Sequence, residues 1–217
     1  YQDWLFDTYA EHLQGRVLDL GAEEDQLCRY NHDSADISEY ITVDLRPDAA
    51  LTLQGDARQL PLEDDSIQTV ILREVLEHVS VGDLPRVVTE VERVLEPGGT
   101  LLLTTPFRFQ IHGFGYTDHV RLTAQGLEAL LMDAGFKNVR VYKGGGFAES
   151  LLSPLQTAWF MLAERLGTDW ATNLFALIHY PVIALAALLD TVVKMTYGEN
   201  IFTSTFYLHN MAIANAS

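Results

Sequence analysis

Short apolar runs alternate along this chain with segments in which apolar residues recur at helical spacing. The runs at 16–20, 39–43, 68–72, 100–104 and 138–142 predict strands, with a further short strand at 51–53 and a last one within 203–214. Helical spacing predicts helices over 3–13 and 84–95, and a third that begins at Thr123 as its N-cap. This alternation indicates an α/β domain with a doubly wound, mostly parallel sheet and helices on both faces.

Beyond Gly144-Gly145-Gly146 the composition becomes apolar and helical, so we predict a helical insert over 147–200 within a single domain that spans residues 1–217. The most apolar stretch, 174–189, is shorter than the roughly 20 residues that a membrane span needs and contains His179 and Pro181. We expect this helix to pack on the domain or on a second copy, which would make a homodimer. Interfacial membrane contact is the less favoured alternative because a Lys/Arg face is missing.

Acidic residues outnumber basic ones, 30 to 14, which gives a formal net charge of −16. Such a surface repels phosphate backbones, so nucleic acid is not expected as a substrate. A high-salt habitat is an open explanation of the acidity. The single cysteine, Cys28, cannot form an internal disulfide, and a reducing cytoplasm is the expected location.

Two segments carry the most specific signal, Gly55 to Val79 and Glu90 to Phe107. They resemble the middle and late motifs of class I S-adenosylmethionine-dependent methyltransferases of the small-molecule type (methyltransferase type 11-like). The resemblance covers roughly residues 1–145 and the last strand. It implies a seven-stranded Rossmann-like sheet with a C-terminal antiparallel strand after the insert, and S-adenosylmethionine as the cofactor.

The loop after the first strand departs from this family. Three glycines usually stand at alternate positions there, because the backbone must approach the methionine end of the cofactor closely. Gly21 matches the first glycine, whereas Glu23 and Asp25 occupy the other two positions. Their side chains crowd the approach and repel the cofactor carboxylate, yet they also attract its ammonium and sulfonium groups. By resemblance, Asp19 would contact the methionine amino group; capping of the turn is the structural alternative.

Further candidates for cofactor binding follow the next strands. Asp44 ends the second strand, where a carboxylate can accept hydrogen bonds from both ribose hydroxyls. By resemblance, Asp56 accepts from the exocyclic amine of adenine and the Ala57 amide donates to a ring nitrogen. Arg73, which closes the strand 68–72, would line the cofactor and substrate. Turn formation, helix capping and surface ion pairs are the alternative roles of these residues.

The acceptor side has no signature, because methyl transfer needs alignment and, for a hydroxyl acceptor, removal of a proton. His112, Tyr116 and His119 are the candidates for a general base. His78 is as readily a structural residue, and irregular spacing gives no reason to predict a metal site. We therefore expect a methyltransferase acting on a small-molecule, lipid-like or glycan-precursor acceptor. The alternative is a catalytically inactive methyltransferase-like protein that serves in binding or as a scaffold.

Overall fold

A computed structural model describes residues 12–22, 36–46, 52–108, 117–144 and 209–217, together with positions 158, 165, 181, 182, 184, 185, 188 and 191. The chain divides into two compact units. The first comprises Tyr1–Pro106, Gly113–Tyr142 and Asn210–Ser217, and the second comprises Phe107–His112 and Lys143–His209. The predicted helix 3–13, most of the insert 147–200 and residues 203–208 lie outside the described positions.

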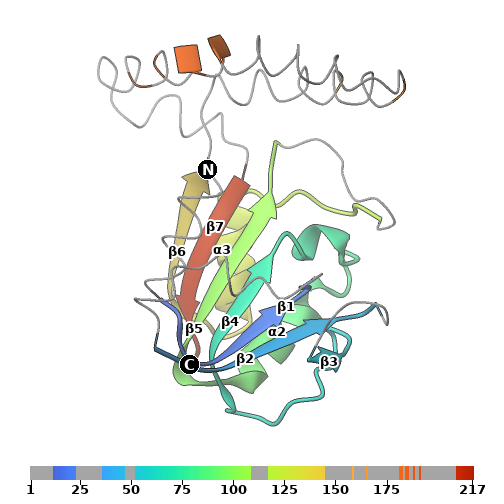
Figure 1. Cartoon of the computed structure of the whole chain (residues 1–217), viewed down its shortest axis with the longest axis vertical. Helices are drawn as coiled ribbons and strands as arrows, with labels where there is room; N and C mark the ends of the chain where they lie inside the picture. Colours follow the sequence, from blue (N-terminus) through green and yellow to red (C-terminus); the bar gives the residue numbers. More distant parts are fainter. Residues whose placement is uncertain are drawn as a thin grey trace. The chain divides into compact units, whose positions relative to one another are not determined.

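One seven-stranded sheet organises the first unit, in the order β3-β2-β1-β4-β5-β7-β6 (Figure 1). Strands β1 to β5 pair in parallel, and β7 runs against its neighbours β5 and β6. This order confirms the predicted doubly wound, Rossmann-like sheet with a C-terminal antiparallel strand. The strands are β1 (Gln14–Leu20), β2 (Asp36–Asp44), β3 (Leu53–Gln54), β4 (Ile67–Arg73), β5 (Leu95–Pro106), β6 (Lys137–Gly144) and β7 (His209–Asn215).

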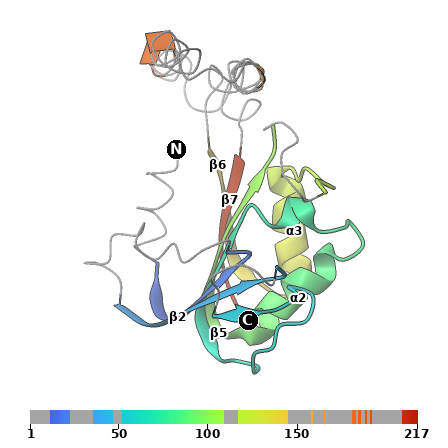
Figure 2. The ribbon, with the colours of Figure 1, turned by 45° about the vertical axis from the view of Figure 1, so that its right-hand side comes forward.

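Two helices, α2 (Leu84–Val94) and α3 (Ala124–Asp133), lie on the same face of this sheet (Figure 2). Both were predicted from their periodicity, and α2 buries the residues that produced it: Leu84, Val87, Val88, Val91 and Val94. The predicted N-cap of α3 is also confirmed, since the Thr123 hydroxyl accepts a hydrogen bond from the Gly126 amide at 3.0 Å. Among the described residues, no helix is long and apolar enough to cross a membrane.

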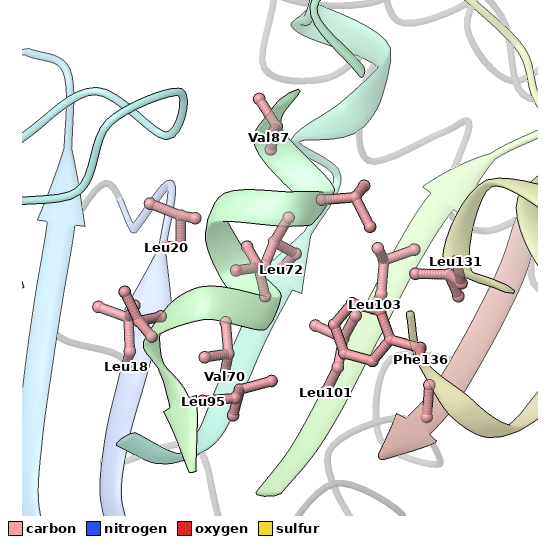
Figure 3. Packing of buried hydrophobic residues seen from close by; sticks show 14 of the residues in the cluster. Leu18, Leu20, Val70, Leu72, Val87, Leu95, Leu101, Leu103, Leu131 and Phe136 are labelled. Carbon is pink, nitrogen blue, oxygen red and sulfur yellow. The ribbon is translucent and has the colours of Figure 1, made fainter. Parts of the chain in front are cut away.

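The main core fills the space between the sheet and these helices (Figure 3). Leu18, Val70, Leu72, Leu101 and Leu103 point from the central strands toward α2 and α3 and are almost fully buried. A smaller cluster lies on the opposite face of the sheet and contains Leu13, Val17, Ile71, Leu102 and Met211. Alternate residues of the central strands thus enter two apolar layers, which explains why these strands read as continuous apolar runs.

Several strand boundaries differ from the prediction, and the starts of β3 and β5 are two of them. Strand β3 begins at Leu53 rather than at residue 51, and β5 begins at Leu95, immediately after α2, rather than at residue 100. The Pro97-Gly98-Gly99 segment, which lies between the predicted helix 84–95 and the predicted strand 100–104, is taken up within β5. Gly98 has a φ of +81°, and the pairing of β4 with β5 shifts register between Ile67 and Thr69. A glycine kink and a bulge therefore replace the expected loop.

Candidate functional site

The strand order changes direction between β1 and β4. From β1 the chain proceeds outward to β2 and β3, and it then returns to the other side of β1 as β4. In open parallel sheets a ligand site forms at such a switch point, outside the carboxyl ends of the strands. The candidates Asp19, Asp44, Asp56 and Arg73 all lie at this edge, at or just after the ends of β1, β2, β3 and β4.

Gly21 turns the chain sharply at the end of β1. Its φ is +83°, and a Cβ atom there would lie 2.5 Å from Cγ2 of Val75. The Gly21 amide donates to the Val43 carbonyl at 2.7 Å, which holds the turn against β2. A side chain is therefore excluded at this position for two independent reasons, the backbone conformation and the close approach of Val75.

Asp19 is buried, with 1% of its surface exposed, and is held from both neighbouring strands. The Tyr40 hydroxyl of β2 donates to its Oδ2 at 2.6 Å, and Nη2 of Arg73 from β4 donates to the same oxygen at 3.1 Å. The structure thus brings together two predicted site residues, Asp19 and Arg73. Tyr40 was missed, although its place two residues before Thr42, the register partner of Asp19, puts it on the same face of the sheet.

Asp44 is also buried, and its carboxylate organises the turn that follows β2. Its Oδ1 accepts from the Arg46 amide at 2.8 Å and from Arg46 Nε at 3.3 Å. Its backbone carbonyl accepts from the Gly55 amide at 3.0 Å, which brings the turn after β3 alongside the end of β2. Asp44 and Asp56 therefore lie on adjacent turns, as binding of one nucleoside by both requires.

The Gly55-Asp56-Ala57 turn packs tightly against its surroundings. A Cβ on Gly55 would approach both Pro61 Cδ and Val43 Cγ1 to 3.0 Å, so the glycine and the following Leu60-Pro61 form one close-packed unit. Asp56 closes the turn, since its carbonyl accepts from the Gln59 amide at 2.9 Å. The spacing of this motif thus has a steric reason that is independent of any ligand.

Helix α2 holds the segment that follows this turn. Glu90 accepts from the Leu60 amide at 2.7 Å, while Arg93 donates to the Leu62 carbonyl at 3.0 Å and pairs with Glu90 at 2.6 Å. The Arg93 hydrogen bond lowers the pKa of Glu90 below its usual value. Glu90 and Arg93 therefore position the loop before β4, a role that the sequence did not reveal.

On the other side of the switch point, β4 ends in a strained turn. Glu74 adopts a φ of +52°, a conformation that is uncommon for a residue with a side chain and that is concentrated at functional sites. Glu77 follows in the short 3-10 helix η3 (Leu76–His78) and is fully buried. Burial, together with the negative charge of Glu74, raises the pKa of Glu77 to about 8. A carboxyl group that is protonated at neutral pH therefore lies beside the end of β4.

The segment 117–122, before α3, is hydrogen-bonded to η3 and to β7. The His119 amide donates to the Glu77 carbonyl at 2.7 Å, and His78 Nδ1 lies 3.2 Å from the Thr117 carbonyl oxygen. The Asn210 side chain donates to the Leu122 carbonyl at 2.8 Å. His78 thus has a structural contact, and the side chain of His119, a candidate base, is exposed at the surface.

Three buried oxygens near the end of β5 and the start of β7 find no hydrogen-bond partner in the part of the chain that the structure describes. They are Oγ1 of Thr104, Oγ1 of Thr105 and Oδ1 of Asn210. Buried polar groups in this state are usually satisfied by water or by a ligand. Sequence reasoning missed all three. The candidates His112 and Tyr116, and the loop residues Glu23 and Asp25, lie outside the described residues.

Comparison with known proteins agrees with this arrangement. Residues 18–103, from β1 into β5, match the family model of a methyltransferase domain. The matched segment resembles the class I S-adenosylmethionine-dependent methyltransferases. The resemblance expected from the two motifs is therefore confirmed.

Curated relatives match this chain over part of their own length. A probable S-adenosylmethionine-dependent methyltransferase of Mycolicibacterium smegmatis is 36% identical over 118 residues, which is 51% of this chain and 42% of that protein. A probable methyltransferase of Mycobacterium tuberculosis is 38% identical over 92 residues, 40% of this chain and 33% of that protein. The chain thus spans less than half the length of these relatives.

Solved structures show the same fold at low identity. A methyltransferase from Archaeoglobus fulgidus superposes with a TM-score of 0.58 and 13% identity, covering 96% of this chain and 88% of that one. Phosphoethanolamine N-methyltransferase 2 of Haemonchus contortus, in complex with S-adenosylmethionine, superposes with a TM-score of 0.53 and 18% identity. The match covers 94% of this chain and 49% of that one. At these identities the likeness establishes the methyltransferase fold and nothing about the acceptor.

Proposed function

We propose that this chain is an S-adenosylmethionine-dependent methyltransferase for a small-molecule acceptor. The observation that carries the proposal is the juxtaposition of the Gly21, Asp44 and Asp56 turns at the switch point of the sheet, inside the segment that matches the methyltransferase domain. The backbone hydrogen bonds that join these turns to β2 support binding of one extended nucleoside compound across β1, β2 and β3.

Each turn offers a group suited to one part of the cofactor. Asp44 would accept hydrogen bonds from the ribose hydroxyls, and Asp56 and the Ala57 amide would bind the edge of adenine. The Gly21 backbone and Asp19 would hold the methionine portion. Arg73, already paired with Asp19 at 3.1 Å, would place a positive charge near the cofactor carboxylate. This charge would oppose the repulsion from Glu23 and Asp25.

The bound cofactor supplies an electrophilic methyl group on a sulfonium. The protein would hold the acceptor atom in line with this methyl group, and a base or water would take up the acceptor's proton. His119, His112 and Tyr116 remain the proposed bases. Thr104, Thr105 and Asn210 carry the buried oxygens that we propose for polar contacts to the cofactor or the acceptor.

The net charge of −16 supports a small acceptor rather than a nucleic acid, because the surface repels polyanions. A lipid-like or glycan-precursor acceptor, a cytoplasmic location and a homodimer formed through the insert remain predictions. The homodimer is supported by three exposed apolar residues of the second unit, Val182, Leu185 and Leu188. They are helical and recur every three residues, so they lie along one side of a helix.

A second candidate function, a methyltransferase-like binding or scaffold protein without activity, is favoured by the same carboxylates. Asp19 is bonded by Tyr40 and Arg73, Asp44 by Arg46, and Asp56 by Arg58. Protein cations thus already contact the groups that the cofactor would need. Glu23 and Asp25 add side chains where the family has glycine.

Calorimetric titration of the whole chain with S-adenosylmethionine and with S-adenosylhomocysteine separates the two functions. We expect saturable binding of both compounds. If neither compound binds at millimolar concentration, only the scaffold function remains.

Within this experiment, Asp44→Ala tests the ribose contact. We expect it to weaken S-adenosylhomocysteine binding by roughly 1 to 3 kcal/mol, because charge-assisted hydrogen bonds to the ribose are lost. Asp36→Ala, at the exposed opposite end of β2, serves as the matched control and should bind like the parent chain. Equal affinity of Asp44→Ala and the parent would remove Asp44 from the site.

A further inference from the structure

Arg58 forms a two-point ion pair with Asp56, the residue proposed to bind the adenine amine. Nη2 lies 2.6 Å from Oδ2, and Nε lies 3.0 Å from Oδ1 and 3.1 Å from Oδ2. The Arg58 amide also donates to Oδ1 at 2.9 Å. We call the side-chain part of this contact the Arg58 fork. It lowers the pKa of Asp56 below its ordinary value, so the carboxylate is ionised.

The same guanidinium touches a second carboxylate on the far side. Nη1 of Arg58 lies 3.3 Å from Oδ2 of Asp83, just before α2. Ser80 donates to that Asp83 oxygen at 2.9 Å, and Arg86 donates to the Arg58 carbonyl at 3.1 Å. Arg58 therefore bridges two acidic side chains, and only one of them lies in the adenine-binding turn.

We propose that Arg58 controls access of the adenine amine to Asp56, by competing for the carboxylate in the free protein and withdrawing to Asp83 when the cofactor binds. The inference rests on the proposed function. A carboxylate offers about four lone-pair positions, and three Arg58 donors already make four contacts with its two oxygens. An incoming amine therefore competes with the fork for the same oxygens.

The energetics allow this exchange. The Arg58 and Asp56 side chains are 45% and 34% exposed, and exposed ion pairs contribute little because water and salt screen them. Withdrawal also keeps the arginine charge compensated, since Asp83 is already in contact and is oriented by Ser80. The Arg58 amide can retain its bond to Oδ1, so the turn itself need not open. Arg58 would thus set the cofactor affinity without blocking the site.

The test is a titration with S-adenosylhomocysteine of the full chain and its variants Arg58→Gln, Asp83→Asn and the double variant. Removal of the fork should tighten binding by roughly two- to fivefold, the worth of an exposed ion pair. Asp83→Asn should weaken binding in the parent, because the withdrawn guanidinium loses its partner, and should have no effect once Arg58 is glutamine. The difference between parent and Arg58→Gln should vanish in about 1 M salt.

Arg140→Gln, an exposed arginine on β6, is the matched control and should bind like the parent. Thermal melting of each variant confirms that it is folded. If the parent binds and Arg58→Gln binds equally or more weakly, the inference is overturned and the proposed function stands. If neither binds at millimolar ligand, both fail. Binding by Arg58→Gln alone would also overturn the inference, because Arg58 would then block the site instead of withdrawing to Asp83.

Discussion

The local structure constrains the identity of Gly21 tightly. This glycine combines a φ of +83° with a crowded surrounding, in which Val75 Cγ2 lies 2.5 Å from the position that a Cβ atom would occupy. Neither constraint involves a ligand. The glycine would therefore be required even in a protein that had lost its cofactor, and its presence alone does not decide between the enzyme and the scaffold.

We predict that Gly21→Ala lowers the free energy of unfolding by about 1 to 3 kcal/mol, from backbone strain and the contact with Val75. Chemical denaturation measures the loss. Gly82→Ala is the matched control, because its added Cβ meets nothing within 4 Å, and it should change stability little. The double change Gly21→Ala with Val75→Ala should recover the steric part only. A loss no larger than that of Gly82→Ala would contradict the described turn.

Asp44 and Asp56 could be proposed as site residues from the sequence because both follow recognisable strands within a recognisable motif. The side chains that bind these carboxylates could not be predicted from the sequence. Arg46 and Arg58 are surface arginines like several others in the sequence, and only the turn geometry directs them back onto the carboxylate two residues earlier. Local charge spacing is too common in surface turns to predict such a pair.

At the scale of elements, the strands and helices follow from periodicity, whereas contacts between elements do not. The burial of Glu77 is the clearest example of such a contact. Its segment, Leu76 to Val79, reads as a family motif, yet the single-turn helix η3 that buries it depends on packing beneath the 117–122 segment. Tertiary contacts of this kind leave no periodic signal in the chain.

Glu77 leads to a prediction about pH. Its pKa is about 8 in the folded chain and near 4.5 when unfolded, so the folded state binds the extra proton between these values. Stability should therefore fall as pH rises from about 5 to about 8, by at most about 1.4 kcal/mol per pH unit. Above that range the carboxylate is ionised in both states and the loss is complete.

Denaturation of Glu77→Gln across this range measures the effect. The amide keeps the shape of the protonated acid, so this variant should match the parent near pH 5 and exceed its stability near pH 9. Glu128→Gln, on the exposed surface of α3, should follow the parent throughout. Parallel stability curves for Glu77→Gln and the parent would contradict the burial of Glu77.

At the scale of the molecule, the methyltransferase domain and the second unit differ in how much can be inferred. The fold of the first unit was predictable because two motifs identify a family with one sheet order. For the second unit, Phe107–His112 and Lys143–His209, composition indicates helices and an apolar surface but no partner. Its acceptor or oligomeric role depends on contacts that composition does not encode.

The central claim is that one adenosyl compound binds across the ends of β1, β2 and β3. A crystal structure of the chain with S-adenosylhomocysteine tests it most directly. We predict nucleoside density with its ribose hydroxyls on Asp44, its adenine edge on Asp56 and Ala57, and its homocysteine above Gly21. A Glu23 or Asp25 side chain filling the space above Gly21, with no nucleoside at this edge, would contradict the claim.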